Sequence, residues 1–274
     1  MIVGRFAPTP SGALHFGSLI AALGSFISAK SKGGKWLVRI EDIDKARTIK
    51  GADSEILRQL EAYALFWDGE IVYQSKRIET YREAIASLGD MVYPCYCSRS
   101  DLEPFGGIHP QKCPTKNGEK SAALRLRVSD LPIGFSDKLC GYFEQNLRKE
   151  VGDFALFNAL GEPAYHLAVT IDDWFSGVTQ IVRGRDLLDS TPRQIYLQRL
   201  FNFRSIEYAH LPLALGDDGQ KLSKQNLAKP IDKSNAPQTL IKALNFLGYN
   251  PPRSLCKQTA IEIISWALKE KGQD

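Results

Sequence analysis

The sequence has no run of apolar residues long enough to cross a membrane, and its N-terminus lacks the charged segment and apolar stretch of a secretion signal. Internal repeats and low-complexity tracts are also missing. The five cysteines are an odd number, which argues against a disulfide framework in a chain without an export signal. These absences exclude membrane-spanning, repeat and disulfide-scaffold proteins. We therefore expect a cytoplasmic protein whose 274 residues form one large or two modest domains.

The opening loop of the chain is neither of the two common phosphate-binding loops, since it has no Gly-x-x-x-x-Gly-Lys and no Gly-x-Gly-x-x-Gly pattern. Its surroundings nevertheless predict a nucleotide-binding sheet. Residues 2–6 can form a short buried strand, and the prolines and glycine of residues 7–16 force a loop. Apolar residues at three- and four-residue spacing over 19–27 then predict a helix, and 36–40 a second strand. Strand, loop, helix and strand open a parallel sheet, in which ligands bind beyond the carboxyl ends of the strands.

Two polar segments are candidates for binding phosphate. His15 and Gly17 lie at the predicted helix start, where free backbone N–H groups and the helix dipole favour an anion. A histidine near a helix start is more often a cap or a surface residue. The second segment, residues 217–224, is a polar turn that carries Lys221 and Lys224. Taken alone, this segment is equally well explained as an ordinary solvated basic loop.

Together these segments resemble the paired signatures of the class I aminoacyl-tRNA synthetases. Residues 15–18, His-Phe-Gly-Ser, stand where that family has His-Ile-Gly-His, and residues 221–225, Lys-Leu-Ser-Lys-Gln, stand where it has Lys-Met-Ser-Lys-Ser. The last residue of each segment departs from the family pattern. Residues 5–12 and 39–44 narrow the resemblance to the glutamyl and glutaminyl subgroup. The resemblance extends to about residue 230.

The resemblance implies an α/β fold, with a Rossmann-type parallel sheet split by a small zinc-containing α+β insertion and followed by a short helical region. We expect residues 1–92 and 165–230 to form the split catalytic domain, residues 93–164 the insertion, and residues 231–274 the helical region. Within these limits the pattern predicts helices over 53–67, 76–88, 237–247 and 257–269, a helix starting at Ser190, and strands over 124–128, 151–158, 164–171 and 205–215.

The insertion contains the spacing Cys-x-Cys-x11-His-x3-Cys, formed by Cys95, Cys97, His109 and Cys113. Four such ligands within nineteen residues, separated by a Gly-Gly turn, can form one tetrahedral zinc site. The alternative is three buried thiols and a surface histidine. Full coordination leaves no open position, so the Zn²⁺ would be structural. Short relatives in the family carry a structural zinc in this region with a tyrosine as third ligand, so that His109 would be a departure.

The resemblance also implies the substrate sites. The glutamate site would be lined by Arg5, Ala7, Thr9, Glu41, Tyr165 and Arg183. Two arginines suit an acid better than an amide, although a local salt bridge between Arg5 and Glu41 is the alternative. ATP, with Mg²⁺ bridging its phosphates, would be held by His15, Gly17 and Lys224. Lys224 would stabilise the leaving pyrophosphate, and Lys221 would support the loop.

The implied reaction is the activation of L-glutamate by ATP without tRNA, followed by transfer to a hydroxyl group. Beyond the lysine loop we expect only two short helices, and residues 221–274 carry nine Lys or Arg against four Asp or Glu. This suits contact with a nucleic-acid backbone better than base readout. Within the family, the chain resembles short paralogues that transfer glutamate to queuosine in the anticodon stem-loop of tRNA(Asp). We expect a monomeric ligase; the alternatives are a minimal synthetase that charges a tRNA 3′ end and an inactive tRNA-binding paralogue.

Overall fold

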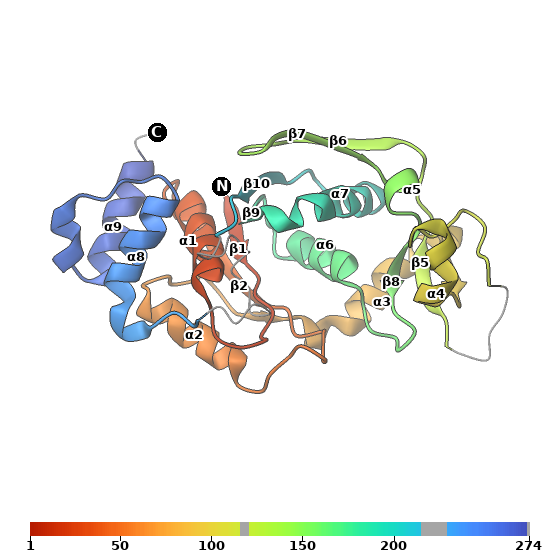
Figure 1. Ribbon diagram of the computed structural model, residues 1–274, viewed down its shortest axis with the longest axis horizontal. Coiled ribbons are helices and arrows are strands. Elements are labelled where there is room, and N and C mark those ends of the chain that lie inside the picture. Colours follow the sequence, from red (N-terminus) through yellow and green to blue (C-terminus); the bar gives the residue numbers. More distant parts are fainter. Residues whose placement is uncertain (116–120, 215–228, 273–274) are drawn as a thin grey trace. The chain divides into compact units, whose positions relative to one another are not determined.

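The computed structural model describes residues 1–115, 121–214 and 229–272 (Figure 1). The chain divides into two compact units. The first unit comprises Met1–Gln74, Val178–Leu187 and Ile206–Asp274, and the second comprises Ser75–Gly177 and Leu188–Ser205. Each unit is thus assembled from segments that are separated in the sequence. The expected domain limits at residues 92, 164 and 230 stay a prediction.

A parallel sheet forms the centre of the first unit, as the sequence predicts. Strands β1 (Val3–Phe6), β2 (Lys35–Ile40) and β3 (Val72–Tyr73) pair in that order, and β9 (Gln180–Gly184) pairs with β10 (Glu207–Leu211). Thr179 joins the two groups, because its N–H donates to the Val3 carbonyl and its hydroxyl accepts from the Val3 N–H, both at 2.9 Å. The carboxyl ends of the strands therefore meet at one edge.

Helix α1 (Phe16–Lys30) packs its apolar face against this sheet. Trp36 of β2 is fully buried beneath it, with the Phe26 ring edge-on at 5.1 Å. The indole N–H donates to the Ser25 hydroxyl at 2.9 Å, so the only polar atom of this large side chain is satisfied. The helix begins where the sequence predicts, with His15 as its N-cap residue.

The two C-terminal helices belong to the same apolar core. Helices α8 (Ala236–Phe246) and α9 (Ala260–Lys271) confirm the predictions over 237–247 and 257–269, and α9 begins with a capping box formed by Thr259 and Glu262. Both helices pack on α1, and Figure 1 shows the three side by side. Helix α2 (Ala52–Ala62) is shorter than the predicted 53–67, because Ala64 adopts a left-handed φ of 55° that ends it.

The second unit combines antiparallel strands with helices. Its three-stranded sheet has the order β4 (Val92–Cys95), β5 (Ala123–Leu126) and β8 (Phe154–Phe157), and a separate hairpin joins β6 (Pro132–Asp137) to β7 (Gly141–Asn146). The helices are α3 (Ile78–Ala86), α4 (Arg99–Leu102), α5 (Leu147–Glu150), α6 (Tyr165–Phe175) and α7 (Thr191–Leu200). None of the helices described in either unit is long and apolar enough to cross a membrane.

The prediction of a strand over 164–171 is wrong, because these residues begin helix α6. The helix buries every residue from Leu167 to Asp173, including Thr170 and both aspartates, so its polar residues do not mark an exposed face that would reveal a helical period. The β-branched residues of this run then favoured a strand. The hairpin of β6 and β7 had no counterpart among the predicted strands. Strands β8 and β10 lie within the predicted ranges, and β5 overlaps its range but begins one residue before it.

Gln59 joins two distant segments of the first unit, and we expect its replacement to cause a measurable loss of stability. Its side chain accepts from the Leu14 N–H at 2.7 Å and donates to the Ile231 carbonyl at 3.1 Å, and it is only 1% exposed. Gln59→Leu would leave both backbone groups buried without a partner, each at a cost of about 1–3 kcal/mol. Urea unfolding should show this loss. The matched control, Arg58→Ala on the exposed face of the same helix, should change stability by less than about 0.5 kcal/mol, and equal stability of the two variants would contradict the role of Gln59.

Candidate functional site

Buried charged side chains gather at the carboxyl ends of the parallel strands in the first unit. Arg5 in β1 is 5% exposed, and Glu41 follows the last residue of β2. Arg39 donates to Glu41 over 3.2 Å. Sequence reasoning considered Arg5 as the partner of Glu41 and missed Arg39. The two-residue period of a strand could have identified it, since residues 39 and 41 lie on one face.

Arg183 of β9 lies at the same edge and contacts a residue that the sequence did not suggest. The parallel register places it opposite His210 of β10, and its Nε donates to His210 Nε2 at 3.1 Å. Its Nη2 donates to the Leu187 carbonyl at 3.3 Å, and the guanidinium lies 5.6 Å from the centre of the Tyr208 ring. These contacts fix the orientation of the arginine. His210 is 1% exposed and accepts the arginine N–H at its Nε2 atom.

The loop after β1 is held against two other segments. The Glu41 N–H donates to the Pro8 carbonyl at 3.0 Å, which anchors the loop that contains Ala7 and Thr9 to the end of β2. At the start of α1, His15 Nδ1 accepts from the Ser18 N–H at 3.3 Å. A neutral His15 with this bond carries its proton on Nε2. The first turn of α1, which includes Gly17, thus lies beside a ring with a polar N–H.

The segment that follows the lysine loop lies beside His15. Pro230 forms an antiparallel bridge with His15, and the Ile231 N–H donates to the Leu14 carbonyl at 2.9 Å. Lys221 and Lys224 themselves lie outside the described residues. The structure therefore places residues 230 and 231, which follow the second signature in the sequence, beside the first signature.

Tyr165 is the one predicted glutamate-site residue that belongs to the second unit, where it begins α6. Its ring lies edge-on to His166, with the ring centres 5.2 Å apart. Arg5, Ala7, Thr9, Glu41 and Arg183 all belong to the first unit.

The second unit contains the four predicted metal ligands in one cluster. The Sγ atoms of Cys95, Cys97 and Cys113 and the Nε2 atom of His109 all lie within 4.8 Å of one another. Individual separations are 3.2 Å for Cys95 to His109, 3.2 Å for Cys97 to Cys113 and 3.9 Å for Cys95 to Cys113. A tetrahedral metal ion with bonds of about 2.0–2.3 Å holds such ligands roughly 3.5–3.8 Å apart. The cluster could therefore bind a metal ion.

The surroundings of His109 prepare its ring for a metal. Nδ1 donates to the Pro110 carbonyl at 2.8 Å and also lies 3.2 Å from the Tyr93 hydroxyl, which itself donates to Asp153 at 2.8 Å. These contacts leave Nε2 to face the sulfur atoms. Burial lowers the pKa of His109, with Arg125 adding to the effect, so the imidazole is neutral and able to ligate. Arg148 pairs with Asp153 at 3.0 Å and balances its charge.

Metal binding should weaken as the pH falls, because the ligands must lose protons. Burial, together with Cys97, raises the pKa of the metal-free Cys113 thiol to about 11, so the thiol is protonated at neutral pH. Each proton released on binding makes the affinity roughly tenfold lower per unit fall in pH. Competition with a chelator, using Zn²⁺ as the probe ion, measures this slope. Cys256→Ser, at an exposed cysteine, should retain the slope and Cys113→Ser should flatten it, whereas a pH-independent affinity would contradict the assignment of the ligands.

Comparison with known proteins supplies independent information. The family model for class I tRNA synthetases (E and Q), catalytic domain, matches residues 1–108 and 108–267. The glutamyl-Q tRNA(Asp) synthetase of Pseudomonas fluorescens is 46% identical over 97% of this chain and 90% of its own length. The enzyme of the same name from Ectopseudomonas mendocina is 48% identical over 96% of this chain and 91% of its own.

A solved structure gives the same result at the level of the fold. The glutamate tRNA ligase from Elizabethkingia meningosepticum, determined in complex with its amino acid, superimposes with a TM-score of 0.72 at 28% identity. The match covers 82% of this chain and 52% of that ligase. This chain therefore spans about half the length of that solved ligase but nine tenths of the curated relatives.

Proposed function

The chain belongs to the class I tRNA synthetases of the E and Q type, and we propose that it activates L-glutamate with ATP and transfers the glutamyl group to queuosine at the wobble position of tRNA(Asp). The observation that carries this proposal is the match, over nearly the full length, to relatives that bear the name of that activity. The catalytic-domain family makes the protein a ligase of the aminoacyl-tRNA synthetase type. Charging of a tRNA 3′ end and loss of catalysis are the less favoured functions.

The buried charges of the first unit supply a site for the two ends of glutamate. Arg5 and Arg183 would bind the side-chain carboxylate, and Glu41, oriented by Arg39, would bind the α-ammonium group. Ala7 and Thr9 would shape the pocket from the loop after β1, and Tyr165 would complete it. The α-carboxylate then attacks the α-phosphorus of ATP, an oxygen–phosphorus bond forms, and the bond to pyrophosphate breaks. The products are glutamyl adenylate and pyrophosphate.

The phosphate groups of ATP would lie at the start of α1. The backbone N–H groups near Gly17 and the Nε2–H of His15 suit phosphate oxygens. Mg²⁺ bound with ATP would bridge the phosphates and neutralise part of their charge. Lys224 would stabilise the leaving pyrophosphate and Lys221 would support its loop, whose following segment is anchored at His15.

We propose Zn²⁺ as the ion of the cysteine and histidine cluster, because three thiolates and one imidazole form a donor set typical of structural zinc. When bound, it would cross-link β4 to the loop that follows and leave no position for a substrate. We also propose that the protein acts as a monomer in the cytoplasm and that it contacts tRNA(Asp) at the anticodon stem-loop. The expected domains, 1–92 with 165–230, 93–164 and 231–274, remain part of this proposal.

Lys224→Ala should slow glutamate-dependent ATP–pyrophosphate exchange by roughly 10²–10³-fold, the usual effect of losing one transition-state contact. The apparent affinity for glutamate should change little, because the charge matters mainly as pyrophosphate departs. Lys229→Ala is the matched control, since it removes an exposed lysine shortly after the loop. An unchanged exchange rate in Lys224→Ala would remove this residue from the mechanism.

Transfer should require queuosine and not the 3′ end of the tRNA. The test uses tRNA(Asp) from which the terminal adenosine has been removed by periodate and elimination before queuosine is restored. We expect labelling with radioactive glutamate to be retained, because the vicinal hydroxyls of the queuosine ring resemble those of a ribose. Queuosine-free tRNA with an intact 3′ end serves as the control. Labelling of that control alone would indicate an ordinary glutamyl-tRNA synthetase.

A further inference from the structure

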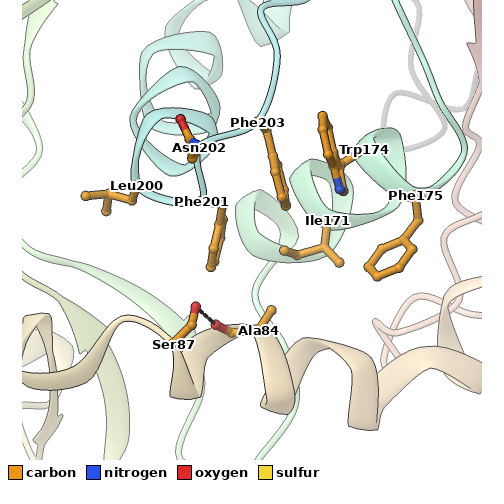
Figure 2. A pocket seen from close by; sticks show the side chains of 9 residues that line it. All are labelled: Ala84, Ser87, Ile171, Trp174, Phe175, Leu200, Phe201, Asn202 and Phe203. Atoms are coloured by element: carbon orange, nitrogen blue, oxygen red, sulfur yellow. Dashed lines mark hydrogen bonds between the residues drawn. The ribbon is translucent and has the colours of Figure 1, made fainter.

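An open pocket of about 400 Å³ with aromatic walls lies within the second unit, apart from the metal ligands (Figure 2). Trp174 and Phe175 from the end of α6 line it together with Phe201 and Phe203, which follow α7. The opposite wall comes from α3, where the small side chains of Ala84 and Ser87 leave room. The pocket therefore has aromatic rings on one side and two small side chains on the other.

The turns that end the two helices place these rings. After α7, Asn202 adopts a left-handed φ of 55°, and the Phe203 N–H donates to the Gln198 carbonyl at 2.8 Å. This turn stacks Phe203 on Trp174, with ring centres 4.4 Å apart and an angle of 3° between the planes. Phe201 stacks behind it at 5.2 Å. The result is a continuous stack of three parallel or nearly parallel rings.

Two of the aromatic side chains that line the pocket are exposed to solvent. Trp174 is 37% exposed and Phe175 is 63% exposed. Adjacent exposed aromatic rings are uncommon on a protein surface and mark sites that bind a partner. Their position at the end of one helix makes both rings accessible at the pocket.

Two guanidinium groups accompany these rings. Arg77 lies 5.0 Å from the centre of the Phe175 ring and is oriented by an ion pair with the buried Asp172 at 2.6 Å. Arg204 lies 5.7 Å from the centre of the Trp174 ring. Among the residues that the structure describes, no carboxylate lies within ion-pair distance of Arg204. The pocket thus combines aromatic faces with a positive charge that its described neighbours do not balance.

We propose that this pocket binds an unpaired base of an RNA strand, which stacks on the exposed rings of Phe175 and Trp174 while a neighbouring phosphate contacts Arg204. Stacking on aromatic rings beside cationic side chains is how proteins bind single-stranded RNA. The unbalanced charge favours an anionic partner over an apolar protein surface. The identification of tRNA as the natural source of the strand rests on the proposed function, whereas the binding of an RNA base does not.

The test compares an RNA hairpin that has an unpaired loop with a blunt duplex of the same stem, with affinities measured by fluorescence anisotropy. Phe175→Ala should weaken hairpin binding about tenfold or more and leave duplex binding nearly unchanged, because only the hairpin offers free bases. Arg204→Ala should weaken hairpin binding and lower the slope of log affinity against log salt by about 0.7, the contribution of one phosphate in a single strand. The controls are Phe66→Ala and Arg253→Ala, at an exposed aromatic residue and an exposed arginine in the first unit.

A spectroscopic signature separates stacking from a loss of folding. Hairpin RNA should quench part of the tryptophan fluorescence of the protein, and Trp174→Phe should remove that part. Wild-type affinity in both Phe175→Ala and Arg204→Ala would overturn the proposal. Sedimentation could instead detect a dimer that Phe175→Ala dissociates while the RNA affinity stays unchanged. This result would also overturn the proposal and would assign the face to self-association. Absence of glutamate-dependent pyrophosphate exchange in the wild type would contradict the proposed function but leave the RNA measurements intact.

Discussion

One buried amide holds two distant segments of the first unit in contact. Gln59 binds the backbone of Leu14 and of Ile231, two segments that would otherwise expose a polar group to an apolar interior. The start of α1 and residues 230–231 are consequently fixed beside each other in the folded protein. In the proposed reaction, which depends on placement and charge, this arrangement would reduce the ordering that ATP must impose on the protein.

The buried charges at the strand ends also have hydrogen-bond partners, since each described pair supplies a bond to a group that solvent cannot reach. Arg39 supports Glu41, and His210 supports Arg183. A charge buried without such partners would cost several kcal/mol. The supporting residues therefore allow buried side chains of opposite charge to exist in the folded protein. Glutamate, which carries charges of both signs, suits this arrangement.

Local signals allowed much of this structure to be predicted from the sequence. The strands and helix around His15, the two C-terminal helices and the ligand spacing around His109 depend on residues close together in the chain. Helix α6 was mistaken for a strand because burial on all sides removed its period. The roles of Arg39, Gln59 and His210 depend on contacts with other strands and loops, which a single sequence does not reveal. Lys221 and Lys224 remain predictions, as does the part played by Tyr165.

The discontinuity of the first unit has a consequence for how the protein is made. Its core includes both α1 and α9, at residues 260–271, so this core cannot close until those residues have left the ribosome. The second unit needs no residue beyond Ser205 and can form earlier. During synthesis the part of α1 that packs on α9 stays uncovered while more than two hundred residues are added to the chain. Such a delay exposes hydrophobic surface to chaperones and to aggregation, and it makes completion of this core depend on the synthesis of α9.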